Sequence, residues 1–522
     1  MVARLLALAL VFTGLAATST AAKADWYEAS SEHFVIYADD SEKDVRRFAE
    51  NLEKFHSAME YVTGYRTETP SPSSRVTIYV VGNQRAVKKL AGGEKRNVAG
   101  FYIPRAGGSV AFVQDIRLKN GYPDFSTVVL LHEYAHHFLI SNSRYGMPQW
   151  MNEGAAEFFA AASFNKDGSV QVGRPALHRA AELAYSVDVS VEELLDYDLY
   201  LANKGRRHDA FYGRSWLLYH YLVFSEERRG QMRAYQTALA NGNEPVAAAS
   251  DAFGDTKALG RELDAYARQR RMFNLVLGPD KISFGDVAVR PLTEGEEEVM
   301  PLIMRSKRGV TPEQAKELLP EVQAVAAEFP NDAVVLSALA EAEYDAGNLD
   351  AAIDVANRAL DINPGSKNAL VQKGYALFAK ARDADNQDAA FNAAMRPFSA
   401  LNALENDHPL PLMYYYRSYV ERGEAPSENA RHAIERASQL APFDHTLAMN
   451  VATMQAREGK IEIASRTLAP VATAPHGGRR AAFAKSFRAA LAKAEEGEPF
   501  RFNAMLTEQV VVDGPDDGSG GE

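Results

Sequence analysis

The chain has no cysteine among its 522 residues. This absence excludes disulfides, catalysis by a thiol, thiolate metal sites and lipid attachment at a cysteine behind a leader. Positive charge is also in short supply, because 57 Lys and Arg face 69 Asp and Glu and leave a formal net charge of -12. An acidic chain is a poor match for a phosphate backbone or an anionic membrane surface, so we expect no nucleic-acid partner.

Long apolar runs are missing as well. The one apolar stretch near the N-terminus covers residues 5–17, which is shorter than the roughly 20 residues of a membrane-spanning helix. Arg4 precedes it and the small-x-small triplet Ala22-Lys23-Ala24 follows, a pattern typical of a secretory signal. We therefore expect a signal peptide over residues 1–24 and export to a periplasm or the medium, with an uncleaved anchor as the alternative.

A chain of this length is too long for a single hydrophobic core, and its hydrophobic share of 46% is ordinary for globular proteins. Composition and spacing predict four segments after the signal. They are a domain at residues 25–275, a connector at 276–310 with Gly, Pro and a run of Glu, helical repeats at 311–496 and a flexible tail at 497–522.

The first of these segments has an α+β pattern. Strand-like runs at residues 33–37 and 75–81 flank a stretch at 42–62 whose apolar residues have helical spacing. Two further short strands, 98–103 and 109–114, are joined by a Pro- and Gly-containing turn that predicts a hairpin. From residue 125 onward the pattern is almost entirely helical, so we expect a small sheet that leads into helices.

The segment at residues 311–496 repeats with a period near 34. Small residues recur at the spacing where two helices of a repeat cross closely, for example Ala340, Gly347, Ala352 and Ala359 before Pro364. The pattern recurs before Pro442 after an insertion of about ten residues near 381–396. It resembles the tetratricopeptide family, which implies a solenoid with a concave surface for a protein substrate or partner; an unrelated helical bundle is the alternative.

The chemistry is carried by the run Leu131-His132-Glu133-Tyr134-Ala135-His136. Two histidines four residues apart lie on one face of a helix, so both imidazoles can bind one cation. Glu133 is turned about 100° from His132 and can hold a water molecule without binding the cation itself.

A third ligand is expected from the downstream run that contains Glu153 and Glu157. Residues 137–152 leave room for the first helix to end, turn near 145–148 and begin an antiparallel helix that returns Glu153 to the histidines. Two imidazoles and one carboxylate favour Zn²⁺ and leave a fourth position open. Glu157, one turn later, is placed to bind a ligand imidazole. For Glu153 alone, the alternative is a carboxylate that stabilises a helix N-terminus.

With Asn152-Glu153-Gly154 downstream, the His132-Glu133-x-x-His136 motif resembles the gluzincins, the group that contains thermolysin and the aminopeptidase-N-like enzymes. The resemblance implies a zincin-like catalytic domain. It also implies that His132, His136 and Glu153 bind zinc and that Glu133 is the general base. Glu157 would then hydrogen-bond a zinc-binding imidazole without contacting the zinc itself.

A second segment, residues 211–216, resembles the part of aminopeptidase-N-like enzymes whose tyrosine hydrogen-bonds the tetrahedral oxyanion. By that resemblance Tyr212 is the donor, although bulky Trp216 stands where the family has a small residue. Tyr219 and His220 are alternative donors, and a packed core aromatic is the plain structural alternative for all three.

The family's Gly-x-Met-Glu-Asn motif, whose glutamate binds the substrate's free amine, does not occur before His132. Residues 98–102 stand in its place, and Gly100 and Phe101 could bind an extended peptide by strand addition. The departure favours an endopeptidase or a specialised protease over an aminopeptidase.

These patterns together predict a zinc-dependent peptidase with a repeat arm. The main alternative is an interaction protein whose repeats bind partners while the peptidase-like part is slow or inactive. Hydrolysis of a non-peptide amide, such as one in a cell-wall polymer, would use the same site.

Overall fold

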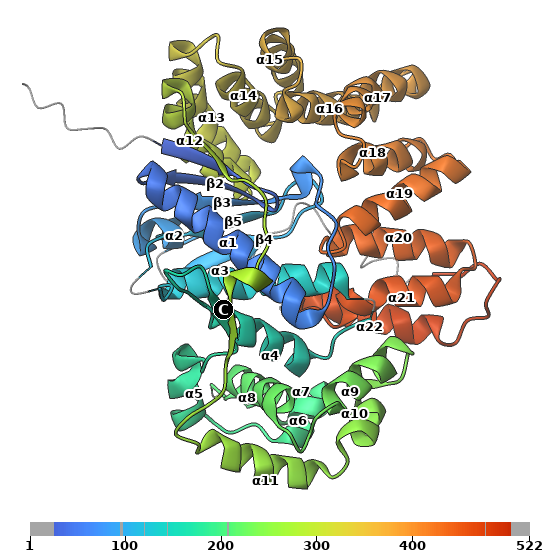
Figure 1. Ribbon diagram of the computed structural model, residues 1–522. Helices are drawn as coiled ribbons and strands as arrows, with labels where there is room; N and C mark the ends of the chain where they lie inside the picture. Colours follow the sequence, from blue (N-terminus) through green and yellow to red (C-terminus); the bar gives the residue numbers. More distant parts are fainter. Residues whose placement is uncertain are drawn as a thin grey trace, which may run out of the picture.

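The computed structural model describes residues 26–93, 98–118, 121–143, 145–205, 208–475 and 477–502. The predicted signal peptide at residues 1–24 and residues 503–522 of the predicted tail lie outside this part. Within the described residues, none of the helices is both long enough and apolar enough to cross a membrane. Figure 1 shows a sheet near the N-terminus, a helical region below it and a curved series of helices beside both.

The N-terminal unit, residues 26–291, is built on a six-stranded sheet of order β4-β5-β3-β2-β1-β9. The inner strands β2, β3 and β5 run parallel, and the remaining pairs are antiparallel. The strands are β1 Trp26–Ser30, β2 Phe34–Asp39, β3 Val76–Val80, β4 Gly100–Ile103, β5 Val110–Val113 and β9 Ala288–Pro291. The four strands predicted from the sequence are β2, β3, β4 and β5.

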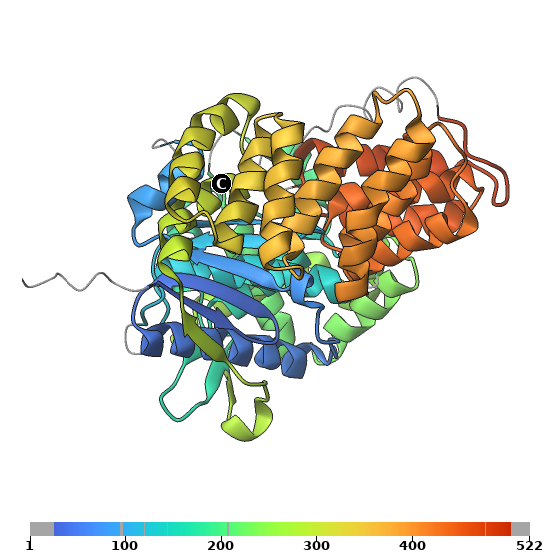
Figure 2. The ribbon, with the colours of Figure 1, turned by 90° about the horizontal axis from the view of Figure 1, so that it is seen from above.

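Both faces of this sheet are buried. Alternate residues such as Ile36 and Ile78 pack against α1 (Glu42–Thr63) and α3 (Phe125–Asn142) in the main core. On the other face, Tyr79 and Phe112 pack against Met300 of α12 (Glu294–Lys307). Figure 2 shows the sheet between blue α1 and the olive helices that follow β9. The period of two along each strand therefore divides its side chains between two separate cores.

The predicted helix at residues 42–62 is α1. Ser41 caps its first turn by accepting a hydrogen bond from the Asp44 amide, and Gly64 ends it with a left-handed φ of 73°. The remaining helices of the N-terminal unit pack mostly below the sheet (Figure 1). They are α2 Gln84–Leu90, α4 Gln149–Ala160, α5 Ala180–Tyr185, α6 Val191–Leu195, α7 Tyr197–Asn203, α8 Phe211–Phe224, α9 Gln231–Ala240, α10 Pro245–Phe253 and α11 Thr256–Ala267, with short 3-10 turns at η1 Pro72–Ser74, η2 Leu177–Arg179 and η3 Pro279–Lys281.

The predicted connector at residues 276–310 is largely integrated into its neighbours. β8 (Leu275–Leu277) pairs with β7 (Val170–Val172), which also pairs with β6 (Ser163–Phe164), in a second sheet. β9 pairs with β1, and α12 belongs to the helical series that follows. The Gly, Pro and Glu content that suggested a linker instead reflects two turns and a capped helix, in which Thr293 and Glu296 form a capping box.

The arm, residues 294–491, is a series of antiparallel helices in which each packs against the next. This supports the helical solenoid that the repeats predicted. Its helices after α12 are α13 Pro312–Glu328, α14 Ala333–Asp345, α15 Leu349–Ile362, α16 Lys367–Ala381, α17 Gln387–Leu404, α18 Pro409–Val420, α19 Glu428–Leu440, α20 His445–Arg457, α21 Ile461–Ala472 and α22 Gly478–Leu491. Its buried small residues, including Ala340, Ala352 and Ala359, lie where neighbouring helices approach.

Several details of the repeat prediction change. Gly347 does not lie at a helix crossing but in the turn after α14, where its φ of 85° favours glycine. Most of the predicted insertion near residues 381–396 is helical and forms the first half of α17. Residues 497–502 of the predicted tail are ordered, since Phe500 and Phe502 pack on Phe487.

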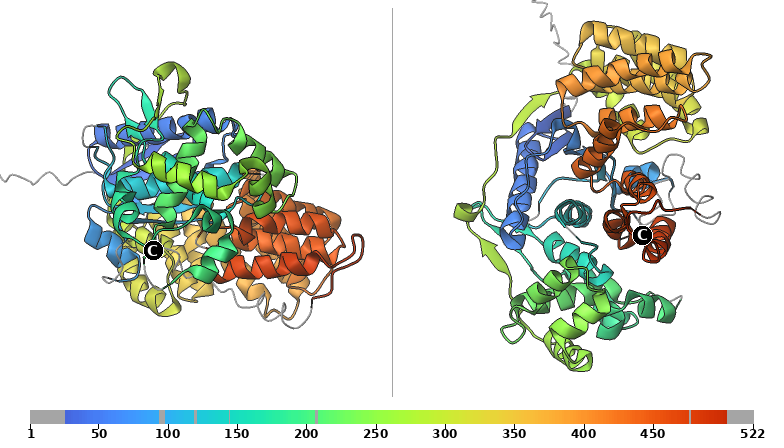
Figure 3. Two further views of the ribbon diagram at one scale, coloured as in Figure 1. Left: turned by 90° about the horizontal axis from the view of Figure 1, so that it is seen from below. Right: turned by 90° about the vertical axis from the view of Figure 1, so that its right-hand side faces the viewer.

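The arm curves around the N-terminal unit and contacts it at both ends. It begins over the second face of the sheet and reaches the outer side of α3 with α19 and α20, as the right-hand view of Figure 3 shows. Further on, the backbone of Ala469 in α21 lies against Gly146 in the turn between α3 and α4. The inner side of the arm is thus occupied in part by the protein's own N-terminal unit.

Candidate metal centre

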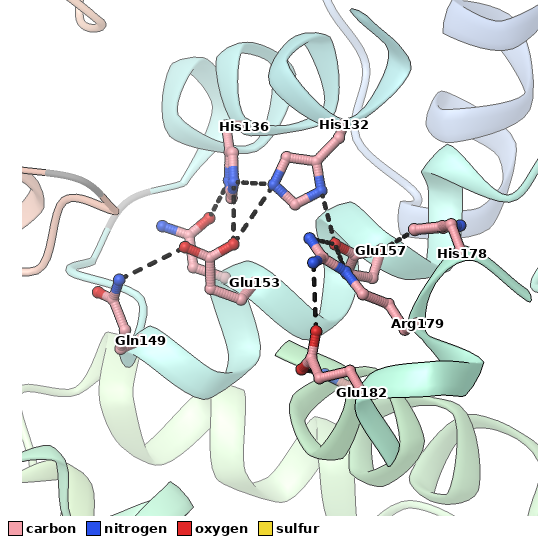
Figure 4. Close-up of polar contacts among 10 residues, drawn as sticks. His132, His136, Gln149, Glu153, Glu157, His178, Arg179 and Glu182 are labelled. Atoms are coloured by element: carbon pink, nitrogen blue, oxygen red, sulfur yellow. Dashed lines mark hydrogen bonds and ion pairs between the residues drawn. The ribbon is translucent and has the colours of Figure 1, made fainter. Parts of the chain in front are cut away.

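The candidate site lies between α3 and α4, which run antiparallel after a short turn. Asp124 begins α3 by capping the amide of Thr127, and α4 begins at Gln149 directly after Pro148. Figure 4 shows His132 and His136 on the upper helix facing Glu153 on the lower one. The turn therefore returns Glu153 to the histidine pair as the spacing predicted.

Three ligand atoms converge at this point. The Nε2 atoms of His132 and His136 are 3.0 Å apart, and Oε2 of Glu153 lies 3.4 Å and 3.3 Å from them. All three residues are buried. Ligands held about 2.0–2.1 Å from a tetrahedral zinc ion are separated by about 3.3 Å, so the spacing of these atoms fits the ion.

The partners behind the histidines fix which nitrogen of each ring faces Glu153. Nδ1 of His132 lies 3.3 Å from Oε1 of Glu157, and Nδ1 of His136 lies 3.0 Å from Oδ1 of Asn152. A neutral ring that donates from Nδ1 presents the lone pair of Nε2 on its other side. Two lone pairs and a carboxylate oxygen then face one another, an arrangement that a cation or a proton must compensate.

The pKa of His132 also responds to the carboxylates around it. Burial lowers this pKa, but Glu157 and Glu153 outweigh the effect and raise it to about 10. A proton held so strongly occupies the position of a cation. A divalent metal would bind by displacing this proton, because a metal ligand must be deprotonated.

Glu157 is the centre of a second group of contacts. Arg179 donates to its Oε1 from Nε at 2.8 Å, and His178 hydrogen-bonds its Oε2. Burial would raise the pKa of Glu157, but His132, His178 and Arg179 hold it well below its usual range. Glu157 is therefore a buried anion that can orient His132 and increase its basicity as a ligand.

Arg179 connects this carboxylate to the segment that contains Tyr212. Its guanidinium lies 4.7 Å from the centre of the Tyr212 ring and 3.2 Å from Oε2 of Glu182. Glu182 in turn accepts a hydrogen bond of 2.7 Å from the amide of Gly213. Burial, followed by Glu153 and more weakly by Glu133, raises the pKa of Tyr212 above its usual range, so the phenol stays protonated near the centre.

Close packing brings the helix of Tyr212 to this position. A Cβ atom on Gly154 would lie 2.3 Å from the backbone oxygen of Ser215, so only glycine lets α8 cross α4 at this distance. The two alternative donors on α8 have other roles. His220 contacts the carbonyl oxygens of Gly173 and Phe273, and Tyr219 packs on Phe158.

Glu133 is half-buried on α3, one residue after His132. Its carboxylate contributes to the electrostatic environment of two phenols, Tyr212 on α8 and Tyr102 on β4. Glu133 follows His132 by one residue on α3, which turns its Cβ about 100° away from that of His132 around the helix axis.

The predicted substrate strand is at the edge of the sheet. Within the part of the chain that the structure describes, β4 pairs with β5 alone, and Gly100 lies close to Ser126 at the start of α3. The ring of Phe101 stacks on Phe112 at 4.7 Å, on the sheet face that α12 covers. Its side chain therefore points away from α3, and only its backbone remains available for strand addition.

A pocket of about 280 Å³ lies beside His178. Its wall is mostly apolar and includes Phe125 and Val128 from the first turns of α3, with Leu177 opposite. Arg174 lies over the ring of Tyr122 at its rim. The pocket can accommodate a bulky apolar side chain next to the candidate centre.

Five polar residues of this site were not predicted: Gln149, Asn152, His178, Arg179 and Glu182. Gln149, one turn before Glu153 on α4, donates to its Oε1 at 3.5 Å. Asn152 directly precedes Glu153, so its place beside His136 follows from the turn geometry and could have been inferred. His178, Arg179 and Glu182 come from the short elements η2 and α5, whose path toward α4 has no periodic signal.

No family model and no curated protein matches the chain. Among solved structures, the thermophilic TPR protein TTC0263 of Thermus thermophilus aligns over 38% of this chain and all of its own, with 14% identity and a TM-score of 0.31. The MamA RS-1 ArsTM double mutant aligns over 34% of this chain and 91% of its own, with 18% identity and a TM-score of 0.26. Yeast Tom70 aligns over 90% and 77%, with 11% identity and a TM-score of 0.27. At such TM-scores the alignments carry no argument about the fold or the function of this chain.

Proposed function

We propose that this protein is an exported zinc-dependent peptidase with a gluzincin-like catalytic unit. The observation that carries the proposal is the convergence of His132 Nε2, His136 Nε2 and Glu153 Oε2 at 3.0–3.4 Å. Each of the two imidazoles has an oxygen partner behind it. This is the donor set and the spacing that a catalytic zinc ion requires.

His132, His136 and Glu153 would hold the ion. When bound, zinc acts as a Lewis acid, which polarises a carbonyl group and lowers the pKa of bound water. Glu133 would accept a proton from the attacking water and donate it to the leaving amine. Tyr212, which stays protonated, would donate a hydrogen bond to the oxyanion that develops on the substrate.

The surroundings of the site support a polypeptide substrate. β4 is an edge strand next to α3 and can pair with an extended peptide through its main chain. The apolar pocket beside His178 can take a large side chain of the same peptide. No glutamate stands on β4 to bind a free amine, which favours cleavage within a chain over removal of its first residue.

The test is cleavage of a mixture of unfolded proteins by the mature protein and by Glu133→Gln, with bound metal measured in both. We expect about one zinc per chain in both samples and a loss of at least about 100-fold in turnover in the variant. A Glu298→Gln variant, altered on α12 away from the site, is the control for an unrelated loss of charge.

Absence of zinc in the wild type would refute the ligand assignment. Zinc without cleavage in the wild type would favour the second candidate function, a repeat protein that binds partners through its arm. The observation behind that candidate is a row of tyrosines on α14, α16 and α18, alternate helices of the arm: the rings of Tyr344 and Tyr414 lie 5.5 Å and 5.1 Å from that of Tyr375. Tyr344 and Tyr375 are partly exposed, and tyrosine is enriched in protein interfaces relative to the rest of the surface.

A further inference from the structure

We propose that the arm positions β4, the strand that would bind substrate, by holding the β4–β5 turn and the outer side of α3. The inference rests on the proposed function and concerns how its site is maintained. It gives the arm a role within the protein itself, in addition to any partner that it binds.

The β4–β5 turn, residues 104–109, contacts three separate parts of the arm. Nη1 of Arg105 donates a hydrogen bond of 2.9 Å to the carbonyl oxygen of Lys307 at the end of α12. The amide of Ala106 donates to Oδ2 of Asp444 at 3.0 Å. At Gly107, a Cβ atom would lie 2.9 Å from Leu410, so the turn lies directly on α18.

Ala106 is buried, and its hydrogen bond to Asp444 is partly buried. Ala106 is only 3% exposed and packs in one cluster with Phe443 and Leu447 of the arm. Because this amide is removed from water, loss of its acceptor would leave a buried donor unpaired, at a cost of about 1–3 kcal/mol. The turn is therefore held by a directional contact as well as by apolar packing.

A second route leads from the arm to the same strand through α3. The ring of Phe443 lies 4.4 Å from that of His137, and Nδ1 of His137 hydrogen-bonds the hydroxyl of Tyr102 on β4 at 2.6 Å. His137 directly follows His136, but its ring is on the other side of α3. Phe443 and Asp444 thus act on β4 from two directions, through His137 and through Ala106.

These contacts lie behind the candidate site rather than over it. Among the described residues, those that line the apolar pocket all come from the N-terminal unit, and none comes from the arm. The arm therefore does not form this pocket, and it contacts β4 through the β4–β5 turn and through α3. Loss of this support would loosen β4 without touching His132, His136 or Glu153.

The test uses Asp444→Asn in the full mature protein. Oδ1 of Asp444 caps α20 by accepting from the Leu447 amide at 2.9 Å, and an asparagine oxygen can keep this cap. The amide nitrogen then faces the Ala106 N–H, so one donor opposes another. Asp332→Asn is the matched control, because Asp332 caps α14 in the same way and its other oxygen accepts from Thr293 at the N-cap of α12.

We expect hydrogen exchange of residues 100–113 to become about tenfold faster in Asp444→Asn and to stay unchanged in Asp332→Asn. Bound zinc should be equal in all three proteins. For a peptide substrate, KM should rise about tenfold while kcat stays within about twofold, because the strand binds the peptide but does not contribute to the chemistry.

Unchanged exchange in Asp444→Asn, or an equal increase in Asp332→Asn, would overturn the inference. Faster exchange with an unchanged KM in an active enzyme would also overturn it, because β4 would then be held without any effect on substrate. If the wild type cleaves nothing, the proposed function fails, while the exchange comparison still decides whether the arm holds β4.

Discussion

Glu157 is a buried anion whose Oε1 atom contacts both Arg179 and Nδ1 of His132. Arg179 contacts its carboxylate from two nitrogens, lies over Tyr212 and also contacts Glu182. One guanidinium therefore links the carboxylate behind a proposed metal ligand to the proposed oxyanion donor. Removing it should disturb both groups together.

We predict that Arg179→Gln lowers kcat/KM by about 10- to 100-fold, the usual effect of removing an outer contact of a metal site. The glutamine cannot reproduce the charge or the contact from two nitrogens. The measurement is peptide hydrolysis with metal content in parallel. Arg305→Gln is the control, because Arg305 on α12 pairs with Glu321 within the arm; equal losses in both variants would contradict the specific role of Arg179.

Among the residues of the site, the sequence predicted those on the neighbouring helices α3 and α4. It missed those that the fold brings in from a more distant part of the chain. The positions of His132, His136, Glu153 and Glu157 relative to one another follow from 3.6 residues per turn and one tight connection. Arg179 reaches Glu157 from more than 20 residues away along an irregular path. No local pattern encodes such a contact.

Among the elements, the crossing of α4 and α8 determines how closely Tyr212 approaches the candidate centre. At Gly154 the backbone of α8 occupies the space that a side chain would need. The glycine next to Glu153 is thus explained by helix packing, whereas its conformation is ordinary for a helix.

We predict that Gly154→Ala destabilises the protein by about 1–3 kcal/mol, because the new methyl group must push α8 away. Gly260→Ala in α11 is the matched control. A Cβ there would meet only Val191, at 3.9 Å, so the change should stabilise the helix by about 0.5–1 kcal/mol. Chemical unfolding of both variants gives the comparison, and a stabilised Gly154→Ala would contradict the packing argument.

Strands with clear apolar alternation were predictable, whereas the pairing of β1 with β9 was not. β2 and β3 show the pattern because they are buried within the sheet. β9 is mostly exposed and contains proline, so it lacks the apolar signal of a strand. Its place follows only from pairing with β1, which is some 260 residues away in the chain.

For the molecule as a whole, Glu405 joins the arm to the N-terminal unit. Ser73 donates to it from both its amide and its hydroxyl, at 2.8 Å and 2.9 Å, and Lys367 pairs with it. Burial would raise the pKa of Glu405, but Lys367 and the hydrogen bonds from Ser73 outweigh it and lower the pKa to about 2. The contact is therefore strongest when Glu405 is ionised.

We predict that Glu405→Gln lowers the free energy of unfolding by about 2 kcal/mol at pH 7. Because the folded pKa lies below the ordinary value near 4.5, this contribution is complete above about pH 4.5 and is lost as the pH falls toward 2. Wild type and variant should thus converge in acid, as measured by urea unfolding at several pH values. The exposed partner of Lys380, Asp350, provides the control Asp350→Asn, which should change little; a difference that persists at pH 2 would contradict the assignment.

The pairing of β1 with β9 also determines where the polypeptide can be divided. A truncation at residue 275, the end of the domain predicted from the sequence, would remove the strand that pairs with β1 from Tyr27 to Ser30. It would also remove Met300 and Met304, which cover Tyr79 and Phe112. Such a fragment would expose an open sheet edge and an apolar face at once, the combination that drives strands of separate molecules to associate. The N-terminal unit is therefore not separable at its apparent boundary, and the beginning of the arm protects it from association.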